Sequence, residues 1–482
     1  MASDTRAPGQ PAAPVFVDGF CDPAKRTWLL VAAILASALG FIDGTVVSIA
    51  LPAMRASLDA DLVQAQWIHN AYMLTLSALI LVGGAAGDRF GLARVFSIGI
   101  GVFLVASVGC ALAPSPQTMV AARTVQGIGA AIMVPGSLAV IARAYPRKDR
   151  GRAIGIWAAA SALTTALGPI IGGLALTFGG PEMWRWIFAV NLPLGALALW
   201  LLWRGVSADP RRDGAPLDWA GAAVATLALL ALAWGLTKEA WGFAALGAAL
   251  LAVFVMVEAR VTAPMMPLSL FASRAFSAAN LLTFLLYAAL NIMFFFMPMT
   301  FIAGWGYSEI DAAATFAPMS VFIALLSSRA GQLADRIGPA PLLAGGAMVV
   351  ACGYAAMALL APYQDIWRHM LPAMCLVGLG MSAVVAPLSS TVIGAVADTQ
   401  TGIASGVNNA ITRMSGLVSV AAVGPVVAGI YAANGGLSSF AVLSDSAGHG
   451  QAMTASFAAL AWISAGLCVM AALIALRALP RR

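Results

Sequence analysis

The sequence predicts an all-α membrane protein that crosses the bilayer about fourteen times. Of its 482 residues, 61% are hydrophobic and 10% are charged, far below the charged share of about 25% that is usual in soluble domains. Apolar stretches of about 17 to 25 residues recur along the chain, and each could cross a hydrocarbon core of about 30 Å as a helix. A charged motif also occurs twice, at positions that fit a repeated helical unit.

The expected spans follow one another over almost the whole chain. The first 27 residues are polar and dotted with proline, without the basic-then-apolar pattern of a signal peptide, so we expect a retained cytoplasmic tail at 1–27. The spans are expected at about 28–52, 65–86, 95–113, 117–141, 152–178, 185–203, 216–236, 241–258, 276–301, 309–328, 340–361, 370–394, 402–432 and 454–476.

Positive charge is distributed unevenly between the two ends of these spans. With a cytoplasmic N-terminus, 20 of the 26 Lys and Arg residues fall in inner segments and four fall outside, while Arg123 and Arg413 lie within spans. This positive-inside pattern predicts a multi-pass membrane protein with both termini in the cytoplasm. The net charge of +6 then reflects topology, and we expect no nucleic-acid partner.

The sequence lacks the groups that several other activities require. The five cysteines lie far apart, which predicts neither a metal cluster nor a disulfide framework. The three histidines are dispersed and no nucleophile-and-base set is present, so we do not expect an enzyme. No G-x-x-x-x-G-K-[ST] loop is present, which argues against a nucleotide-driven pump. We therefore expect no metal and no organic cofactor.

A motif with an acid, a base and glycine occurs twice. GGAAGDRFGLARV (83–95) contains Asp88 and Arg89, and GQLADRIGPAP contains Asp335, 247 residues after Asp88. Eight expected spans separate the copies, which places both on the cytoplasmic side. Six of these spans would form one repeat unit, and the two between about 216 and 258 would be an inserted pair. Parallel repeats around a site near the bilayer midplane are one architecture of secondary transporters.

These motifs together resemble those of the major facilitator superfamily, whose signature G-x-L-A-D-R-x-G lies between the second and third helices of each half. The matching residues are Gly84, Asp88, Arg89 and Gly91 in the first copy, and Gly331, Leu333, Ala334, Asp335, Arg336 and Gly338 in the second. Five further segments resemble motifs of the fourteen-span drug:proton antiporter family. They are FIDGTVVSIALP (41–52), RTVQGIGAA (123–131), GPIIGG (168–173), WRWIFAVNLPLG (184–195) and LDWAGA (217–222).

The resemblance implies a major facilitator fold with two six-helix bundles and two inserted transmembrane helices. The bundles would span 28–206 and 263–482, with the inserted pair in 207–262. It also implies an exporter that exchanges amphipathic small molecules or drugs for protons by alternating access. Its partners would be the lipid bilayer and the substrate, a periplasmic adaptor is left open, and we expect a functional monomer. The alternative is a substrate:proton symporter, or a non-transporting sensor on the same fold.

Two positions depart from the family pattern. Leu92 stands where the family usually has arginine after the motif aspartate, which leaves Arg94 as the nearest base and puts the full charge network at the cytoplasmic gate in doubt. Ser48 stands where the first-span motif usually has asparagine, which could alter the choice of substrate.

Asp43 and Arg123 are the predicted proton-coupling residues. Asp43 is an acid placed well inside a span, where an ionised carboxylate costs about 2.5 to 3.5 kcal/mol on insertion scales. Such an acid could carry protons from a water-accessible cavity, or simply cap or bond a neighbouring helix. Arg123 is expected near the outer end of its span, where it could snorkel. The resemblance implies instead a buried arginine linked to proton movement, with Gln126 on the same helix, and we expect Arg123 to pair with Asp43.

Small residues and charged turns predict the moving parts. Gly168, Pro169, Gly172 and Gly173 would let another helix approach closely, either as plain packing or as a hinge between the halves. Asp88 could form a solvated turn, or could act as a latch on the positive N-terminus of the helix that begins near Gly402. The predicted gating residues also include Gly84, Arg89, Gly91, Arg94, Gly331, Asp335, Arg336 and Gly338.

Polar side chains on the spans are candidates for contact with a mixed polar and apolar ligand. Unpaired amides are expensive in hydrocarbon, so the asparagines are favoured over phenylalanines, which could simply face lipid. His69 is expected near the outer surface. The predicted substrate-binding residues are Asn70, Tyr72, Gln126, Asn280, Tyr287, Asn291, Asn408 and Asn409, with His69, Phe294 and Phe295 as further candidates.

Overall fold

The computed structural model describes residues 19–209, 217–397, 400–436, 440 and 448–479. This part of the chain is helical, with one isolated bridge between Cys21 and Val206. The α-helices are α1 (Arg26–Leu58), α2 (Leu62–Phe90), α3 (Leu92–Ala111), α4 (Pro116–Ala144), α5 (Arg147–Gly179), α6 (Trp184–Ala189), α7 (Asn191–Gly205), α8 (Trp219–Thr237), α9 (Trp241–Glu258), α10 (Arg274–Met299), α11 (Glu309–Ala314), α12 (Ala317–Ile337), α13 (Pro339–Leu360), α14 (Leu371–Gly394), α15 (Thr401–Ala433) and α16 (His449–Ala478).

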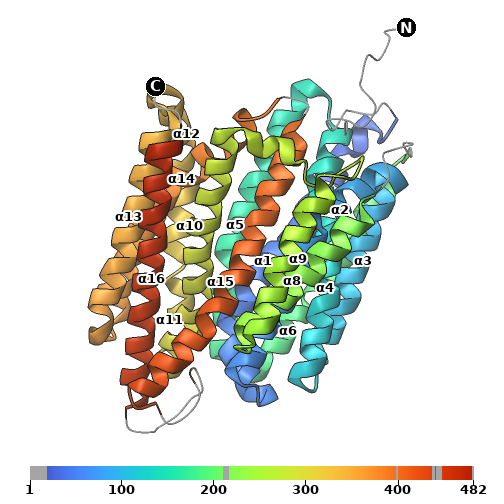
Figure 1. Ribbon diagram of the computed structural model, residues 1–482. Helices are drawn as coiled ribbons and strands as arrows, with labels where there is room; N and C mark the ends of the chain where they lie inside the picture. The colour runs from blue at the N-terminus through green and yellow to red at the C-terminus, as the bar shows by residue number, and fades with distance from the viewer. Residues whose placement is uncertain (1–18, 210–216, 398–399, 437–439, 441–447, 480–482) are drawn as a thin grey trace.

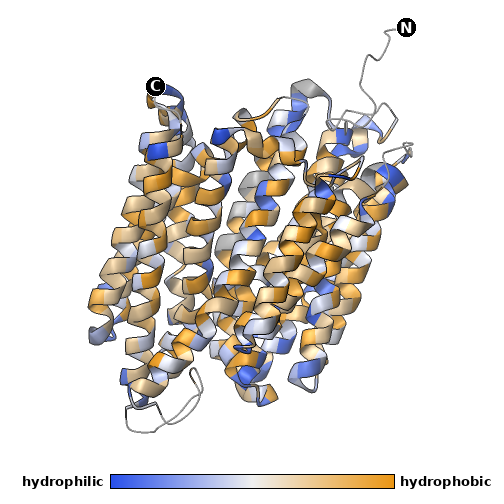
Figure 2. Cartoon of the chain, viewed as in Figure 1, coloured by the Kyte–Doolittle hydropathy of each residue, from blue (hydrophilic) through white to orange (hydrophobic). Residues whose placement is uncertain are grey.

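The lengths and composition of these helices fit a multi-pass membrane protein. Within the described residues, 13 helices are long and apolar enough to cross a membrane. Helix α5 is continuous over 33 residues, and its described apolar stretch, Leu167–Gly179, is shorter. Hydrophobic residues dominate the middle of the helices, and hydrophilic residues gather near their ends (Figure 2). The expected total of fourteen spans remains a prediction.

Two helices extend further than the sequence analysis expected. The acid and base of each repeated motif were expected in turns between spans. In the structure α2 continues to Phe90 and α12 continues to Ile337, so both acid–base pairs lie in the last helical turns. The chain reverses only at the following glycines, Gly91 and Gly338, whose φ angles are 100° and 84°. Because side chains other than glycine rarely adopt such angles, these glycines end the helices.

The helices pack in two groups that follow the order of the chain. In the N-terminal bundle, defined as α1–α7, α2 and α3 pack on α4, and α1 packs on α5 and α7. In the C-terminal bundle, defined as α10–α16, α13 packs on α14 and α16, and α12 packs on α14. The bundles meet where α2 contacts α15 and where α5 contacts α11 and α12 (Figure 1).

Helices α8 and α9 form a hairpin against this seam. Glycines let the two helices approach closely: a Cβ on Gly235 would overlap the backbone of Ala244, and one on Gly247 would overlap the backbone of Leu232. Asp218 caps α8 by accepting a hydrogen bond from the Gly221 amide at 2.7 Å. Helix α8 also packs on α2 and α15, so the hairpin touches both bundles (Figure 1).

Hydrogen bonds join the bundles in the half of the molecule away from the start of α1, which we call the distal half. The Gln66 amide donates to the Val420 carbonyl at 2.6 Å, from α2 to α15. Thr177 of α5 donates to the Glu309 carboxylate at 3.2 Å and accepts from the Ile310 amide of α11 at 3.2 Å. The distal ends of the two bundles are therefore held together in this conformation.

Candidate functional site

A buried charge network connects α1 and α4 inside the N-terminal bundle. The Arg123 guanidinium lies 2.5 Å from the Asp43 carboxylate, and the two side chains are 1% and 0% exposed. Gln126 donates to the other carboxylate oxygen of Asp43 at 3.1 Å and accepts from Arg123 at 2.6 Å. Because each carboxylate oxygen has a donor, the negative charge is compensated without water. The expected pairing is present, and Arg123 does not snorkel to the surface.

A second layer of polar groups fixes the orientation of this network. Arg123 also donates to the Ile68 carbonyl at 3.2 Å, and its guanidinium lies 4.3 Å from the centre of the Tyr72 ring. Gln126 donates to Ser107 at 3.0 Å, and Ser107 also accepts from Asn191 at 3.2 Å. The network thus draws on α1, α2, α3, α4 and α7.

Close packing of α2 on α4 brings Tyr72 to Arg123. A Cβ on Gly127 would overlap the Thr75 hydroxyl and would lie 2.5 Å from the Tyr72 carbonyl oxygen. The Thr75 hydroxyl donates across the same contact to the Thr124 carbonyl at 2.9 Å. Gly127 of the RTVQGIGAA motif therefore serves the site indirectly, because it sets the distance between α2 and α4.

Two predicted ligand residues next to Tyr72 are buried in this conformation. His69 was expected near the outer surface, but it is only 5% exposed and its ring stacks edge-on with Phe295 at 5.3 Å. His69 lies seven residues after the first residue of α2, where Phe295 of α10 covers it, and its depth relative to the outer membrane surface stays a prediction. Asn70 is fully buried, and neither its amide nitrogen nor its amide oxygen has a partner among the described residues.

The predicted residues of the C-terminal bundle fall into two sets. Asn408 of α15 donates to Asn280 at 3.0 Å and to Thr283 at 2.8 Å, so it links α15 to α10. Asn291 and Asn409 instead donate to carbonyls of their own helices. Among the aromatic candidates, Tyr287 is partly exposed. Phe294 packs edge-to-face with Phe316 at 4.9 Å between ring centres, and Phe295 packs edge-to-face with Phe296 at 4.8 Å.

The glycine motif of α5 divides between two partners. A Cβ on Gly168 or Gly172 would meet Val46 of α1, within the N-terminal bundle. A Cβ on Gly173 would lie 2.8 Å from the Glu309 carbonyl oxygen of α11 in the other bundle. Of the three glycines only Gly173 packs between the bundles here, because adjacent positions on a helix point in different directions. Pro169 lies inside α5, which remains helical across it.

An aspartate that the sequence analysis did not single out organises the first gating motif. Asp209, beyond α7, accepts from the Arg94 backbone amide at 2.9 Å and lies 4.0 Å from the Arg143 guanidinium. A Cβ on Gly91 would lie 2.7 Å from the Asp209 carboxylate. Arg94 thus contributes its backbone amide, while its side chain is exposed. Asp209 was missed because a single acid in a loop has no distinctive pattern.

The remaining gating residues make few informative contacts. The side chain of Asp88 lies outside the described part of the structure, so the latch on α15 remains a prediction. The Arg89 guanidinium lies 5.5 Å from the Phe90 ring centre, and Gly84 packs on Pro135. In the second motif Asp335 and Arg336 are exposed, and Gly331 packs on Ala386.

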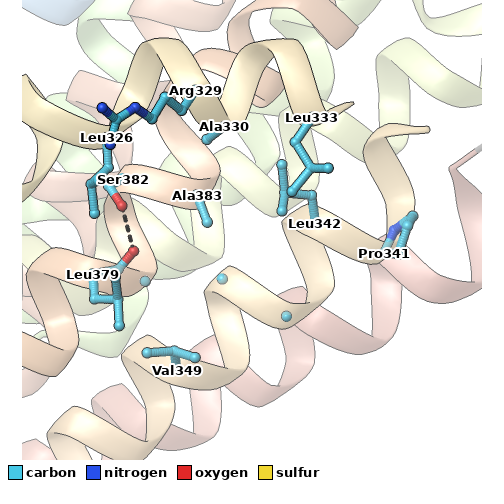
Figure 3. A pocket seen from close by; sticks show the side chains of 13 residues that line it. Leu326, Arg329, Ala330, Leu333, Pro341, Leu342, Val349, Leu379, Ser382 and Ala383 are labelled. Carbon is cyan, nitrogen blue, oxygen red and sulfur yellow. Dashed lines mark hydrogen bonds between the residues drawn. The ribbon is translucent and has the colours of Figure 1, made fainter. Parts of the chain in front are cut away.

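A separate groove lies in the C-terminal bundle between α12, α13 and α14. It has a volume of about 370 Å³ and a mainly apolar lining that includes Leu326, Leu333 and Val349, with Arg329 beside them (Figure 3). None of the predicted substrate-binding residues lines it. The candidate site is therefore the region around the buried ion pair and not this groove.

Comparison with known proteins agrees with this architecture. The family model described as Major Facilitator Superfamily matches residues 33–420. The puromycin resistance protein of Streptomyces alboniger is 33% identical over 466 residues, 92% of each chain. The tetracenomycin C resistance and export protein of Streptomyces glaucescens is 31% identical, over 80% of this chain and 73% of that protein.

Two further similarities concern length and fold. An uncharacterized transporter of Mycobacterium tuberculosis is 33% identical over 79% of this chain, which spans 66% of that longer relative. The crystal structure of a D-xylose-proton symporter superposes with a TM-score of 0.66 at 17% identity, covering 94% of this chain and 98% of the other, and so shows the fold alone. Both the fold and the extent of the family match lead to one conclusion: the chain belongs to the Major Facilitator Superfamily.

Proposed function

We propose that this protein exports amphipathic small molecules or drugs across the bacterial inner membrane in exchange for protons. The relatives named for drug resistance and export support the direction of transport. The observation that supports the proton coupling is the ion pair between Asp43 and Arg123, in which the carboxylate is fully buried in a chain with few charges. Intramembrane acids of this kind mark proton relays and ion pathways.

Proton exchange would act through the stability of this ion pair. Protonation of Asp43 would cancel its charge and leave the guanidinium of Arg123 without a counter-ion, which is costly at this depth. A second conformation in which Arg123 finds other partners would then be favoured. Water must reach Asp43 in that second conformation, because here the carboxylate is sealed by Arg123 and Gln126.

Alternating access would use the contacts in the distal half. With the expected orientation, the distal half faces outward, so the bonds of Gln66 with Val420 and of Thr177 with Glu309 would close the outer side. Rocking of the two bundles about the central site would break these contacts and open the cavity outward. The hairpin of α8 and α9, inserted between the two six-helix bundles, would follow this motion because α8 contacts α2 and α15.

The direction of coupled flux in proteoliposomes tests the function. Vesicles are loaded with a fluorescent amphipathic substrate, and an inward-directed proton gradient is imposed. Antiport predicts accelerated efflux of substrate in the wild type and loss of this acceleration in Asp43→Asn. Gly44→Ala is the matched control on the same helix, because a Cβ at Gly44 meets nothing within 4 Å. Gradient-driven accumulation in the vesicles would indicate a symporter, and absence of flux for the whole substrate panel would indicate a sensor.

A further inference from the structure

Arg413 is a second arginine within a span, and it takes no part in the ion pair of Asp43 and Arg123. It lies 12 residues after the first residue of α15, which places it about 18 Å along that helix. Tyr287 lies 13 residues into α10, at a similar depth from the same end. Arg413 is partly exposed, and among the residues that the structure describes it has no hydrogen-bond or ion-pair partner.

The surroundings of Arg413 place it toward the centre of the molecule. Arg413 lies seven residues from both Gly406 and Val420, so the three residues share one face of α15. Gly406 packs on Leu81 and Val420 accepts the hydrogen bond from Gln66, so this face is turned toward α2 between Gln66 and Leu81, the stretch that contains Tyr72. The ring of Tyr72 also packs against Arg123. Arg413 of the C-terminal bundle therefore faces the stretch of α2 that also contacts the ion pair of the N-terminal bundle.

The charges in this central region do not balance. Asp43 is the acid placed deep within a described span, and Arg123 already neutralises it. The described helix α15 carries Arg413 and no acid. Thus one positive charge remains uncompensated at mid-depth, where unpaired charges are expensive and mark substrate or ion pathways. Such a charge repels organic cations and attracts anions.

We infer that Arg413 binds the acidic group of the transported molecule, so that the site selects amphipathic organic acids over amines of the same size. A guanidinium can donate two parallel hydrogen bonds to a carboxylate. The ring of Tyr287, which is partly exposed at a similar depth on α10, would contact the apolar body of the ligand. This inference rests on the proposed export function and narrows its substrate class.

Binding of three pyrene compounds to the purified full-length protein tests the inference. At pH 7.5, 1-pyrenebutyrate is an anion, 1-pyrenebutyramide is neutral and 1-pyrenebutylamine is a cation, while the aromatic body stays the same. We expect the wild type to bind the anion about 10- to 100-fold more tightly than the amine, as a charge-assisted hydrogen bond implies. Arg413→Gln should remove this preference by weakening the anion alone, and Arg413→Lys should retain most of it.

Matched variants separate ligand recognition from a structural role. Arg329→Gln removes an equal charge from an exposed position on α12 and should leave the preference unchanged. Equal weakening of all three ligands by Arg413→Gln, preference of the wild type for the amine, or no binding of the anion would each overturn the inference. Binding needs no proton gradient, so a failure of proton exchange in the flux assay is distinguished from a failure of acid recognition.

Discussion

Asp43 and Arg123 show how a charge is kept in the membrane interior. Each carboxylate oxygen of Asp43 accepts a hydrogen bond, one from Arg123 and one from Gln126. Arg123 is held in turn by the Ile68 carbonyl and the Tyr72 ring. A buried pair of this kind adds little net stability, but removal of one member leaves the other uncompensated. The pair is therefore well suited to a step that is driven by adding a proton.

Neutralising Asp43 should destabilise the protein, and removing its partner as well should reverse much of the loss. Asp43→Asn is expected to lower the free energy of unfolding by about 3 kcal/mol, because Arg123 stays buried without a counter-charge. The double variant Asp43→Asn/Arg123→Gln should recover more than half of that loss. Reversible unfolding in mixed detergent micelles measures both values.

Gly44→Ala is the matched control for this pair, because a Cβ at Gly44 meets nothing within 4 Å. Its effect should stay within about 0.5 kcal/mol. A double variant that is less stable than Asp43→Asn would show that the two side chains do not compensate one another.

The sequence allows the partners of charged residues within spans to be predicted, but not the partners of amide side chains. Asp43 and Arg123 could be predicted because charges in an apolar span need a partner. The partners of Asn291 and Asn409 could not, since spacing alone does not tell whether an amide bonds its own helix or a neighbour. Arg413 was noted in the sequence only as lying within a span, because the face that it turns toward α2 depends on how the two bundles pack.

At the scale of the helices, glycine sets how closely neighbours approach. Gly127 brings α4 to α2, and Gly173 brings α5 to α11 of the other bundle. These two contacts differ in consequence, because the first lies inside one bundle and the second closes the distal side. The α5–α11 contact must separate if the distal side opens during transport.

A larger side chain at Gly173 should favour the open distal side. Gly173→Val would push on the Glu309 carbonyl, 2.8 Å from the Cβ position, and on Ala313. Overpacking of this size costs about 1 to 3 kcal/mol in the closed conformation, so the open population should rise about tenfold. Maleimide labelling of a cysteine introduced by Ser419→Cys, a buried position next to Val420, measures the opening.

The control for this effect lies on the same helix. A Cβ on Gly155 meets nothing within 4 Å, so Gly155→Ala should leave the labelling rate unchanged. The exposed Cys352 is replaced by serine in every variant to remove background labelling. Equal labelling rates in Gly173→Val and the parent would show that this contact does not control the distal side.

The positions of most helices could be predicted from hydropathy, whereas their ends could not. Asp88 and Asp335 seemed too polar for a span, yet α2 and α12 carry them in their last turns because a membrane-spanning helix can extend into water. Hydropathy also joined α11 and α12 into one span, although the chain leaves the α-helix at Thr315. Local backbone breaks of this kind leave no trace in average hydropathy.

At the scale of the whole molecule, the hairpin of α8 and α9 is the feature that touches both bundles. Helix α8 packs on α2 and on α15. Most of the α9 surface is not covered by other helices. The two helices have 19 and 18 residues, which gives lengths of about 28 and 27 Å. The helices around them are longer, and α1 has 33 residues.

Exchange should therefore depend on bilayer thickness. A hairpin of this length matches a hydrocarbon core slightly thinner than about 30 Å, and mismatch costs a fraction of a kcal/mol per Å. We expect the exchange rate in proteoliposomes to be highest in phosphatidylcholines with acyl chains of about 16 to 18 carbons and to fall severalfold at 22 carbons. A rate that is flat across this series would show that the hairpin does not transmit mismatch to the bundles.

If exchange depends on bilayer thickness in this way, the short hairpin makes the surrounding lipid a participant in transport. If a cell stiffens or thickens its envelope under stress, the hydrophobic mismatch would act first on the hairpin of α8 and α9. Because α8 contacts both α2 and α15, the resulting strain would reach these two helices together. Pumping speed could in this way follow the physical state of the membrane, without a dedicated sensor domain or a change in the amount of protein.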